Sequence, residues 1–367
     1  MLDFIPLSIY TDLFNFLIFG LIVVALYDSF SGQLFEPAVR NINNVVGPII
    51  LIVVILYMGL RPVSFEFGDT INYAHSFFRL QMSGVSFRIA DNSEWVFNTI
   101  MLWFAKYGNI HSFFLFCATI YVGALWWAFK RIFNKDFLIP LIVAMAMFEF
   151  WSYGTNGIRN GMAASIIILA LTYRSNLIVM VLLSVIGLGI HNSMSLMLAA
   201  AAVAFFVKDS KWYFYFWVAC IPLSLIGGNT ITNLIIDNNL IGDDRFEQYL
   251  TSTDNLNEFS KTGFRWDFLL YSALPVVVGY YFIFKKKYTD VFYIWLYNIY
   301  LLCNAFWIIV IRASFSNRFA QISWFIIPLV LIYPFFMKKF WPNQQTKIGY
   351  VVIISYLYTF YRVLVAL

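Results

Sequence analysis

Three arginines stand at the beginning of apolar stretches of the chain: Arg159, Arg265 and Arg318. A cation is disfavoured in the first turn of a helix, because the free backbone N–H groups there carry a partial positive charge. The same N–H groups bind anions well, and guanidinium groups bind phosphate oxygens through paired hydrogen bonds. The repeated placement therefore predicts an anion site, and the planar fork of arginine suits a diphosphate.

The segment around Arg159 also contains small and capping residues. Thr155 or Asn156 is expected to cap a helix that begins just before Arg159. Gly157 and Gly161 would then give that helix a small-residue face, against which another helix or a lipid-linked substrate could lie. A packing motif with an arginine that reaches toward the membrane surface is the alternative interpretation.

A second group of arginines surrounds the short polar segment 313–317. Arg312 ends one apolar run and Arg318 opens the next, so two guanidiniums are expected near one connection. They are interpreted as substrate-binding groups, with interfacial anchoring to lipid headgroups as the alternative. Arg265 stands two residues before Asp267, and an ion pair between them is expected.

Five further residues could take part in proton transfer or substrate binding. His191, one of three histidines, is a plausible proton acceptor near neutral pH. Asp69 and Tyr73 are one helical turn apart and could share a face, and Arg61 opens the same segment. Glu149 is an acid within an apolar run, which makes it a candidate functional group. A satisfied interfacial histidine, an ordinary helix cap at Asp69 and simple neutralisation of charge by Glu149 remain open.

The composition predicts a protein that crosses a membrane many times. Of the 367 residues, 61% are hydrophobic and only 12% are charged, against roughly 25% charged in a soluble domain. The apolar runs have about the length that a bilayer core requires. Twelve spans are predicted near 8–28, 45–61, 111–130, 137–153, 160–174, 176–191, 192–207, 211–233, 265–284, 290–311, 318–337 and 348–365.

One further apolar run, 94–107, is short and contains Glu94, Asn98 and Lys106, so an interfacial or re-entrant helix is expected there. Lysine clusters recur at every second boundary of the later spans, and the positive-inside rule assigns them to the cytoplasm. The arginines then gather on the outer side. The prediction is one all-helical transmembrane domain over 1–367, with long outer loops at 62–110 and 234–264.

Several chemistries find no support in the sequence. No His/Cys spacing suits a metal, and neither a phosphate-binding loop nor a dinucleotide fingerprint is present. The net charge of +5 comes from basic residues in the loops between the predicted spans and not from a basic stripe. Nucleic acid is therefore not an expected partner. Cys117, Cys220 and Cys303 fall within predicted spans and are expected to be buried thiols. A site without metal or cofactor is expected, in which guanidiniums neutralise charge.

Four motifs, taken in their order along the chain, resemble the EpsG-like group of Wzy polysaccharide polymerases. The resemblance is carried by Leu60-Arg61 with Gly68-Asp69-Thr70 and Tyr73, by 156–163 around Arg159, by Ile190-His191-Asn192-Ser193 and by Asn317-Arg318. It implies a bacterial inner-membrane glycosyltransferase with a GT-C-like helical fold and its site at the periplasmic face. Such enzymes join undecaprenyl-diphosphate-linked repeat units, as in O-antigen, and a chain-length-regulating co-polymerase is a possible partner.

On this hypothesis, the arginines would hold the diphosphate of the donor and stabilise its departure. His191 or Asp69 would take the proton of the acceptor hydroxyl, and the lipid tails would lie in grooves between helices. A flippase for the same lipid-linked units, an O-antigen ligase and a membrane acyltransferase remain as alternatives.

Overall fold

Helices make up all the regular secondary structure in the described part of the chain. The computed structural model describes residues 2–84, 87–237, 263–312 and 316–366, without the side chains of 228–237 and 362–366. No strand occurs within these ranges, which agrees with the predicted all-helical fold. The chain divides into two compact units: unit 1 is Met1–Asn192 with Phe335–Leu367, and unit 2 is Ser193–Pro334.

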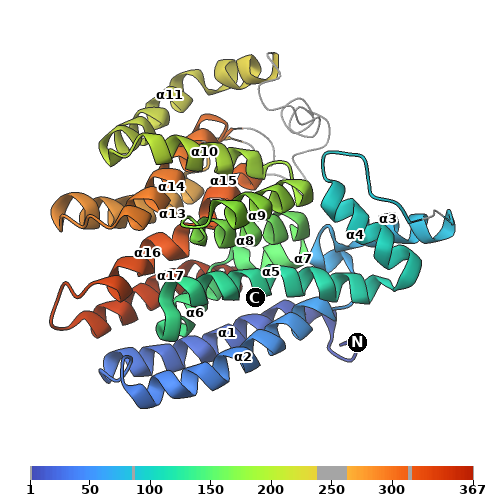
Figure 1. Cartoon of the computed structure of the whole chain (residues 1–367), viewed down its shortest axis with the longest axis horizontal. Helices are drawn as coiled ribbons and strands as arrows, with labels where there is room; N and C mark the ends of the chain where they lie inside the picture. The colour runs from blue at the N-terminus through green and yellow to red at the C-terminus, as the bar shows by residue number, and fades with distance from the viewer. Residues whose placement is uncertain (1, 85–86, 238–262, 313–315, 367) are drawn as a thin grey trace. The chain divides into compact units, whose positions relative to one another are not determined.

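Unit 1 contains long apolar helices and the short helices of the first predicted loop (Figure 1). Its elements are α1 (Leu7–Phe30), α2 (Pro37–Gly59), η1 (Phe65–Phe67), α3 (Thr70–Met82), α4 (Trp95–Tyr107), α5 (Ile110–Phe133), η2 (Asn134–Asp136), α6 (Leu138–Ala146), α7 (Glu149–Thr155), α8 (Ile158–Thr172), α9 (Leu177–Ile190) and α17 (Gln344–Ala366). The predicted outer segment 62–110 thus contains two helices of its own, α3 and α4.

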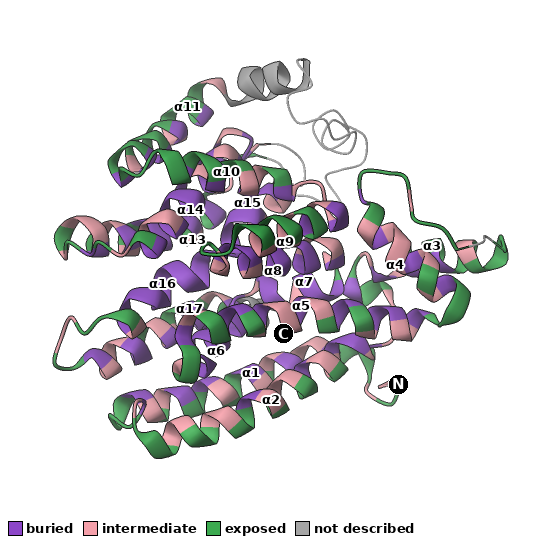
Figure 2. Cartoon of the chain, in the orientation of Figure 1, coloured by how far each residue is buried: buried purple, intermediate pink, exposed green. Residues whose placement is uncertain are grey.

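The hairpin of α1 and α2 shows how apolar helices in unit 1 are joined. The Tyr10 hydroxyl donates to the Tyr57 carbonyl at 2.7 Å, and the Tyr57 hydroxyl donates to the Tyr10 carbonyl at 2.8 Å. Phe14 and Ile18 of α1 are buried, whereas Phe16 between them is 60% exposed. Figure 2 shows buried and exposed positions along this helix. A helix that buries one apolar face and exposes another apolar face fits a lipid environment.

Helix α5 begins at the end of the predicted outer segment 62–110. It begins with a capping box, in which Asn109 and Ser112 satisfy each other's backbone N–H groups. It packs along α8, and α8 packs in turn along α9. A Cβ at Gly161 of α8 would lie 2.5 Å from the Tyr153 carbonyl oxygen, so this glycine permits close packing of α8 on α7. This contact supports the packing interpretation of Gly161.

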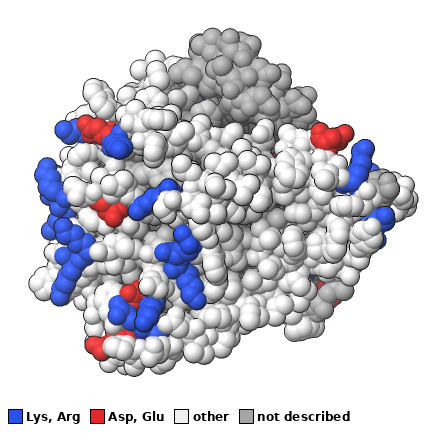
Figure 3. All heavy atoms as spheres, in the orientation of Figure 1, with Lys and Arg blue, Asp and Glu red and all other residues white. Residues whose placement is uncertain are grey.

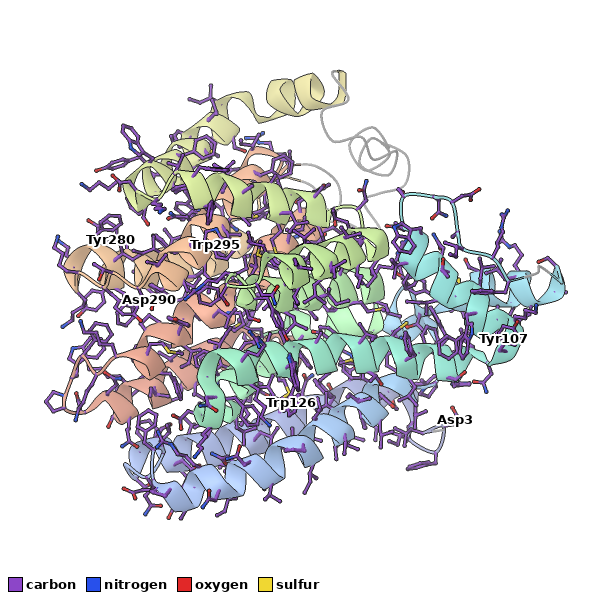
Figure 4. All side chains as sticks on the ribbon, in the orientation of Figure 1. Asp3, Tyr107, Trp126, Tyr280, Asp290 and Trp295 are labelled. Atoms are coloured by element: carbon purple, nitrogen blue, oxygen red, sulfur yellow. The ribbon has the colours of Figure 1, made fainter. Side chains whose placement is uncertain are left out.

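Unit 2 consists of α10 (Met194–Phe206), α11 (Ser210–Asp237), α13 (Trp266–Tyr280), the π-helical turn η4 (Tyr281–Lys285), α14 (Val291–Ile309), α15 (Asn317–Trp324) and the beginning of α16 (Ile327–Met337). Asp290 caps α14, because its side chain accepts from the Tyr293 N–H at 2.8 Å. One turn later, Trp295 donates to the Ala201 carbonyl at 2.8 Å and ties α14 to α10. Figure 4 labels Asp290 and Trp295 on this helix.

In the described part of the chain, six helical segments are long and apolar enough to cross a membrane, and a bent pair makes a possible seventh. The six are Leu7–Phe30, Pro37–Gly59, Ile110–Asp136, Trp266–Lys285, Val291–Ile309 and Asn317–Met337. Helices α8, α9 and α10 are apolar but only 15, 14 and 13 residues long. Uncharged side chains make up most of the visible surface (Figure 3). The chain is therefore a helical membrane protein, and the predicted total of twelve spans goes beyond what helix length alone supports.

Two local features differ from the expected helices. The run 137–153 is not one continuous helix but is broken into α6 and α7, which meet at an angle of 79°, as in a broken span or a re-entrant loop. The break follows from Met147, whose backbone is extended (φ −65°, ψ 138°). The N-cap of α8 is Gly157 rather than Thr155 or Asn156, and no side chain caps this helix end.

The prediction for the cysteines is confirmed: Cys117, Cys220 and Cys303 are free and buried.

Candidate functional site

A carboxylate between two basic side chains forms the centre of the candidate site in unit 1. Glu94, the N-cap of α4, places its Oε2 atom 2.5 Å from Nη1 of Arg159. Its Oε1 atom lies 2.6 Å from Nδ1 of His191, the residue that ends α9. The Glu94 side chain is only 5% exposed, compared with 24% for Arg159 and 14% for His191. An ion pair this enclosed is less screened by solvent than a surface pair.

Tyr73 completes the surroundings of Arg159. Its hydroxyl accepts a hydrogen bond from Nε of Arg159 at 3.3 Å. The guanidinium carbon also lies 5.5 Å from the Tyr73 ring and 5.7 Å from the Phe97 ring, within the range of cation–π attraction. Burial raises the pKa of Tyr73, while the charge of Arg159 opposes that shift. The phenol therefore stays protonated, and its oxygen can accept from Arg159.

Asp69 is held beside this group by a tight turn. The backbone N–H of Asp69 donates to Oδ1 of Asn156 at 2.8 Å, which joins the start of α3 to the segment before α8. Gly68 has a φ of +58°, and a Cβ there would collide with the Asn156 side-chain amide. Only glycine fits this turn without strain. The Asp69 carboxylate accepts from the Asn72 side chain at 3.0 Å.

Arg61 supports the same region from inside the protein. It is 0% exposed and donates to the Met58 carbonyl at 2.6 Å, the Thr70 hydroxyl at 2.8 Å and the Thr155 carbonyl at 3.2 Å. Its guanidinium also lies 4.6 Å from the centre of the Phe114 ring. Burial lowers the pKa of Arg61 to about 10, so the side chain still carries its charge at neutral pH. It ties the end of α2 to the beginning of α3 and the end of α7.

Unlike Arg61, Arg159 has guanidinium N–H groups that no described residue accepts. Among the described residues, its hydrogen bonds are those from Nη1 to Glu94 and from Nε to Tyr73. Within the same part of the chain, Nη2 has no hydrogen-bond partner. With the side chain 24% exposed, this edge of the guanidinium can receive an anion.

The other predicted acid, Glu149, lies where the chain bends between α6 and α7. It is 2% exposed and begins α7. The carboxylate that pairs with Arg159 is instead Glu94. The interpretation of Glu149 as the neutralising partner of Arg159 is therefore replaced by Glu94.

The remaining predicted arginines belong to unit 2. Arg265 precedes α13 and makes the expected ion pair with Asp267, at 2.6 Å. Arg318 lies in the first turn of α15, as predicted. Arg312 donates from Nη2 to the Leu225 carbonyl at 3.1 Å. The connection at 313–315, across which Arg312 and Arg318 were expected to face each other, lies outside the described residues, as does most of the predicted outer loop 234–264.

Unit 1 thus brings together Asp69, Tyr73, Asn156, Arg159 and His191, which come from three separate parts of the sequence. Glu94 was not among the predicted site residues. A signal was present, because an acid stands directly before the apolar run 94–107 on the same predicted side as Arg159. The sequence did not reveal that this acid contacts both Arg159 and His191.

The arrangement can bind an anion and accept a proton within one small region. The free edge of Arg159 supplies hydrogen-bond donors for phosphate oxygens. His191 uses Nδ1 toward Glu94, so Nε2 is the ring nitrogen that can take a proton from a substrate. In residues 2–84, 87–237, 263–312 and 316–366, no group of three or more His, Cys, Asp or Glu side chains is arranged to hold a metal ion.

These features define the class of protein as a helical membrane protein with a buried cluster of Glu94, Arg159 and His191. The family model for the EpsG family matches residues 44–367, which is most of the chain. The chain therefore belongs to the EpsG family, the family of Wzy-like polysaccharide polymerases. Membership gives its general activity, that of a polymerase-type membrane glycosyltransferase. Neither the curated proteins nor the solved structures include a significant match to the chain.

Proposed function

We propose that this protein joins oligosaccharide repeat units carried on undecaprenyl diphosphate, at the periplasmic face of a bacterial inner membrane. The observation that carries the proposal is the cluster of Arg159, Glu94 and His191, in which an available guanidinium edge and an imidazole share one carboxylate. Transfer from a lipid diphosphate requires both groups: one for the leaving diphosphate and one for the proton of the acceptor hydroxyl.

The reaction follows from this assignment. The hydroxyl oxygen of the acceptor glycan attacks the anomeric carbon of the donor glycan. The bond from that carbon to the diphosphate oxygen breaks, and the lipid diphosphate leaves with the electron pair. Nε2 of His191 takes the hydroxyl proton. Arg159 stabilises the charge that develops on the leaving group, so no metal is needed for this step.

The other residues near the cluster are assigned to the substrate or to its support. Asp69 and Tyr73 are proposed to orient sugar hydroxyls, and Asn156 holds the Asp69 turn in place. Arg61 is proposed to act by supporting this turn, because its donors already bind protein oxygens. Glu149 remains a proposed site residue, as a buried acid at the bend between α6 and α7.

For unit 2, the hypothesis remains that Arg265, Arg312 and Arg318 bind lipid-linked phosphate. The proposal also includes twelve membrane crossings and a GT-C-like arrangement, supported by the helices found at every predicted span. The periplasmic side is favoured by the lysine clusters, which the positive-inside rule assigns to the cytoplasm. A chain-length-regulating co-polymerase stays a prediction from the family resemblance.

Reconstitution in liposomes tests the proposal. The purified protein is supplied with purified lipid-linked repeat units, without lipid A core and without an energy source. The expected result is a ladder of glycans, each one repeat unit longer than the last, together with released undecaprenyl diphosphate. Transfer only when lipid A core is added would instead identify a ligase. Movement of the lipid across the bilayer without chain growth would identify a flippase.

A further inference from the structure

Glu94 is the residue through which the anion-binding side and the proton-accepting side of the site are joined. Its two carboxylate oxygens are directed to different basic groups, Oε1 to His191 and Oε2 to Arg159, at 2.6 and 2.5 Å. A carboxylate that is only 5% exposed needs such partners, because burying a lone charge is costly. We infer that Glu94 is a positioning residue that orients His191 and Arg159 together and balances the charge of each in turn.

The contact with Glu94 engages Nδ1 of His191 and so bears on which tautomer the ring adopts. An ionised carboxylate only accepts hydrogen bonds, so Nδ1 of His191 must carry the proton that points to Glu94. In the neutral ring, Nε2 then has a lone pair and no proton. Glu94 therefore selects the form of His191 that can accept a proton from a sugar hydroxyl.

The contact with Arg159 determines which edge of the guanidinium meets the ligand. Glu94 accepts a hydrogen bond from Nη1, and the Tyr73 hydroxyl accepts one from Nε. These two contacts fix the plane of the guanidinium and direct the Nη2 side toward an incoming anion. Without Glu94, Arg159 would keep its charge but lose this orientation.

The charges of the cluster change together during the proposed reaction, on which this inference rests. In the free site, the Glu94 carboxylate pairs with Arg159 and faces Nδ1 of His191. When a diphosphate binds, its negative charge pairs with Arg159 in place of Glu94. The Glu94 carboxylate can then stabilise the imidazolium that forms as Nε2 takes the hydroxyl proton. Tyr73, whose hydroxyl accepts from Arg159, is a further titratable side chain in contact with the cluster.

Glu94→Gln tests both parts of the inference, with Glu66→Gln as the matched control. Glu66 is an exposed acid in η1 of the same segment, and its backbone N–H is bonded to Ser64. Turnover of Glu94→Gln is expected to fall about 100-fold, the usual size of a general-base contribution. The amide oxygen of Gln can still accept from Nη1 of Arg159 and keep the plane of the guanidinium. Binding of inorganic pyrophosphate is therefore expected to tighten about tenfold, because no carboxylate charge competes for the arginine.

A purely structural role would lower turnover and weaken pyrophosphate binding together. Equal turnover in the Glu94 and Glu66 variants, or pyrophosphate binding that does not tighten, would overturn the inference. Glu94→Asp keeps the charge with a shorter reach, and it is expected to recover part of the lost turnover. No recovery would mean that the carboxylate charge is not what matters.

A measurement on the unaltered protein avoids any variant that fails to fold. Nitrogen chemical shifts are recorded for protein labelled only at its three histidines, with the His191 signals assigned by His191→Asn. The expected neutral form has a protonated Nδ1 and an unprotonated Nε2. The reverse tautomer would overturn the inference even if the liposomes produced polymer. If no polymer formed but the expected tautomer were present, the proposed substrate would be wrong while the role of Glu94 in the cluster would stand.

Discussion

Arg61 and Arg159 are two arginines of unit 1 near the same turn, and their surroundings give them different roles. Arg61 is 0% exposed, and its donors are used by the Met58 and Thr155 carbonyls and the Thr70 hydroxyl. Arg159 is paired with Glu94 and still has an accessible edge. The comparison shows that a guanidinium near a helix end indicates a ligand site only when its donors are not already used by the protein.

The largest effect is expected for Arg159→Lys. Lysine keeps the positive charge but cannot reach Glu94, Tyr73 and a diphosphate at the same time. Polymer formed per molecule of protein should fall about 100-fold or more, with the protein level unchanged. The control is Arg131→Lys. Like Arg159, Arg131 lies beside a tyrosine ring (Tyr173), but it bonds Thr172 and is in the last turn of α5, away from the cluster around Glu94. Long polysaccharide chains made by the Arg159→Lys variant would refute the role of Arg159 in binding the diphosphate.

For Arg61→Met we expect a loss of stability with little loss of turnover, which is the opposite of the result expected for Arg159→Lys. The substitution removes the donors for two buried carbonyls and a hydroxyl, which should destabilise the fold by about 2 kcal/mol. Thermal unfolding of the purified protein should therefore occur at a lower temperature, while turnover per folded molecule changes by less than a few fold. A fully stable variant that produced no polymer would show that Arg61 acts directly on the substrate, as the sequence suggested.

The turn at Gly68 gives a matched pair of substitutions. Gly68 and Gly84 have similar positive φ values, +58° and +61°, but only Gly68 lies against another residue, Asn156. Gly68→Ala should displace Asp69 and Asn156 and reduce turnover about tenfold, because small misplacements near reacting groups are costly. Gly84→Ala introduces a similar backbone strain and should leave turnover unchanged. Equal turnover in both variants would remove Asp69 from the site.

The smallest effect is expected for Tyr73→Phe. The ring that lies beside Arg159 is kept, and only the hydroxyl that accepts from Nε is lost. One such hydrogen bond corresponds to roughly a fivefold to tenfold change in turnover. Tyr107→Phe is the control, because Tyr107 is 60% exposed at the end of α4 (Figure 4). A loss as large as that of Arg159→Lys would mean that Tyr73 itself takes part in the chemistry.

Much of the fold was predictable because it depends on local properties of the chain. A run of apolar residues about as long as a bilayer is thick must form a helix, since no water is available to satisfy its backbone groups. The run 94–107, expected to form a separate short helix because it is brief and contains charged residues, is α4. The break between α6 and α7 was not predictable, because Met147 is an ordinary helix former whose extended backbone depends on its surroundings.

The sequence by itself determined that the chain is helical and apolar, that Arg159 and Arg318 occupy first turns of helices, and that the motifs are those of the EpsG family. These properties follow from composition, helix signals and the order of short motifs. Only the tertiary structure decided that Glu94 lies between Arg159 and His191 and that Arg61 is enclosed. The physical reason is that ion pairing and burial depend on distances between residues far apart in the chain: 65 positions separate Glu94 from Arg159, and 97 separate it from His191.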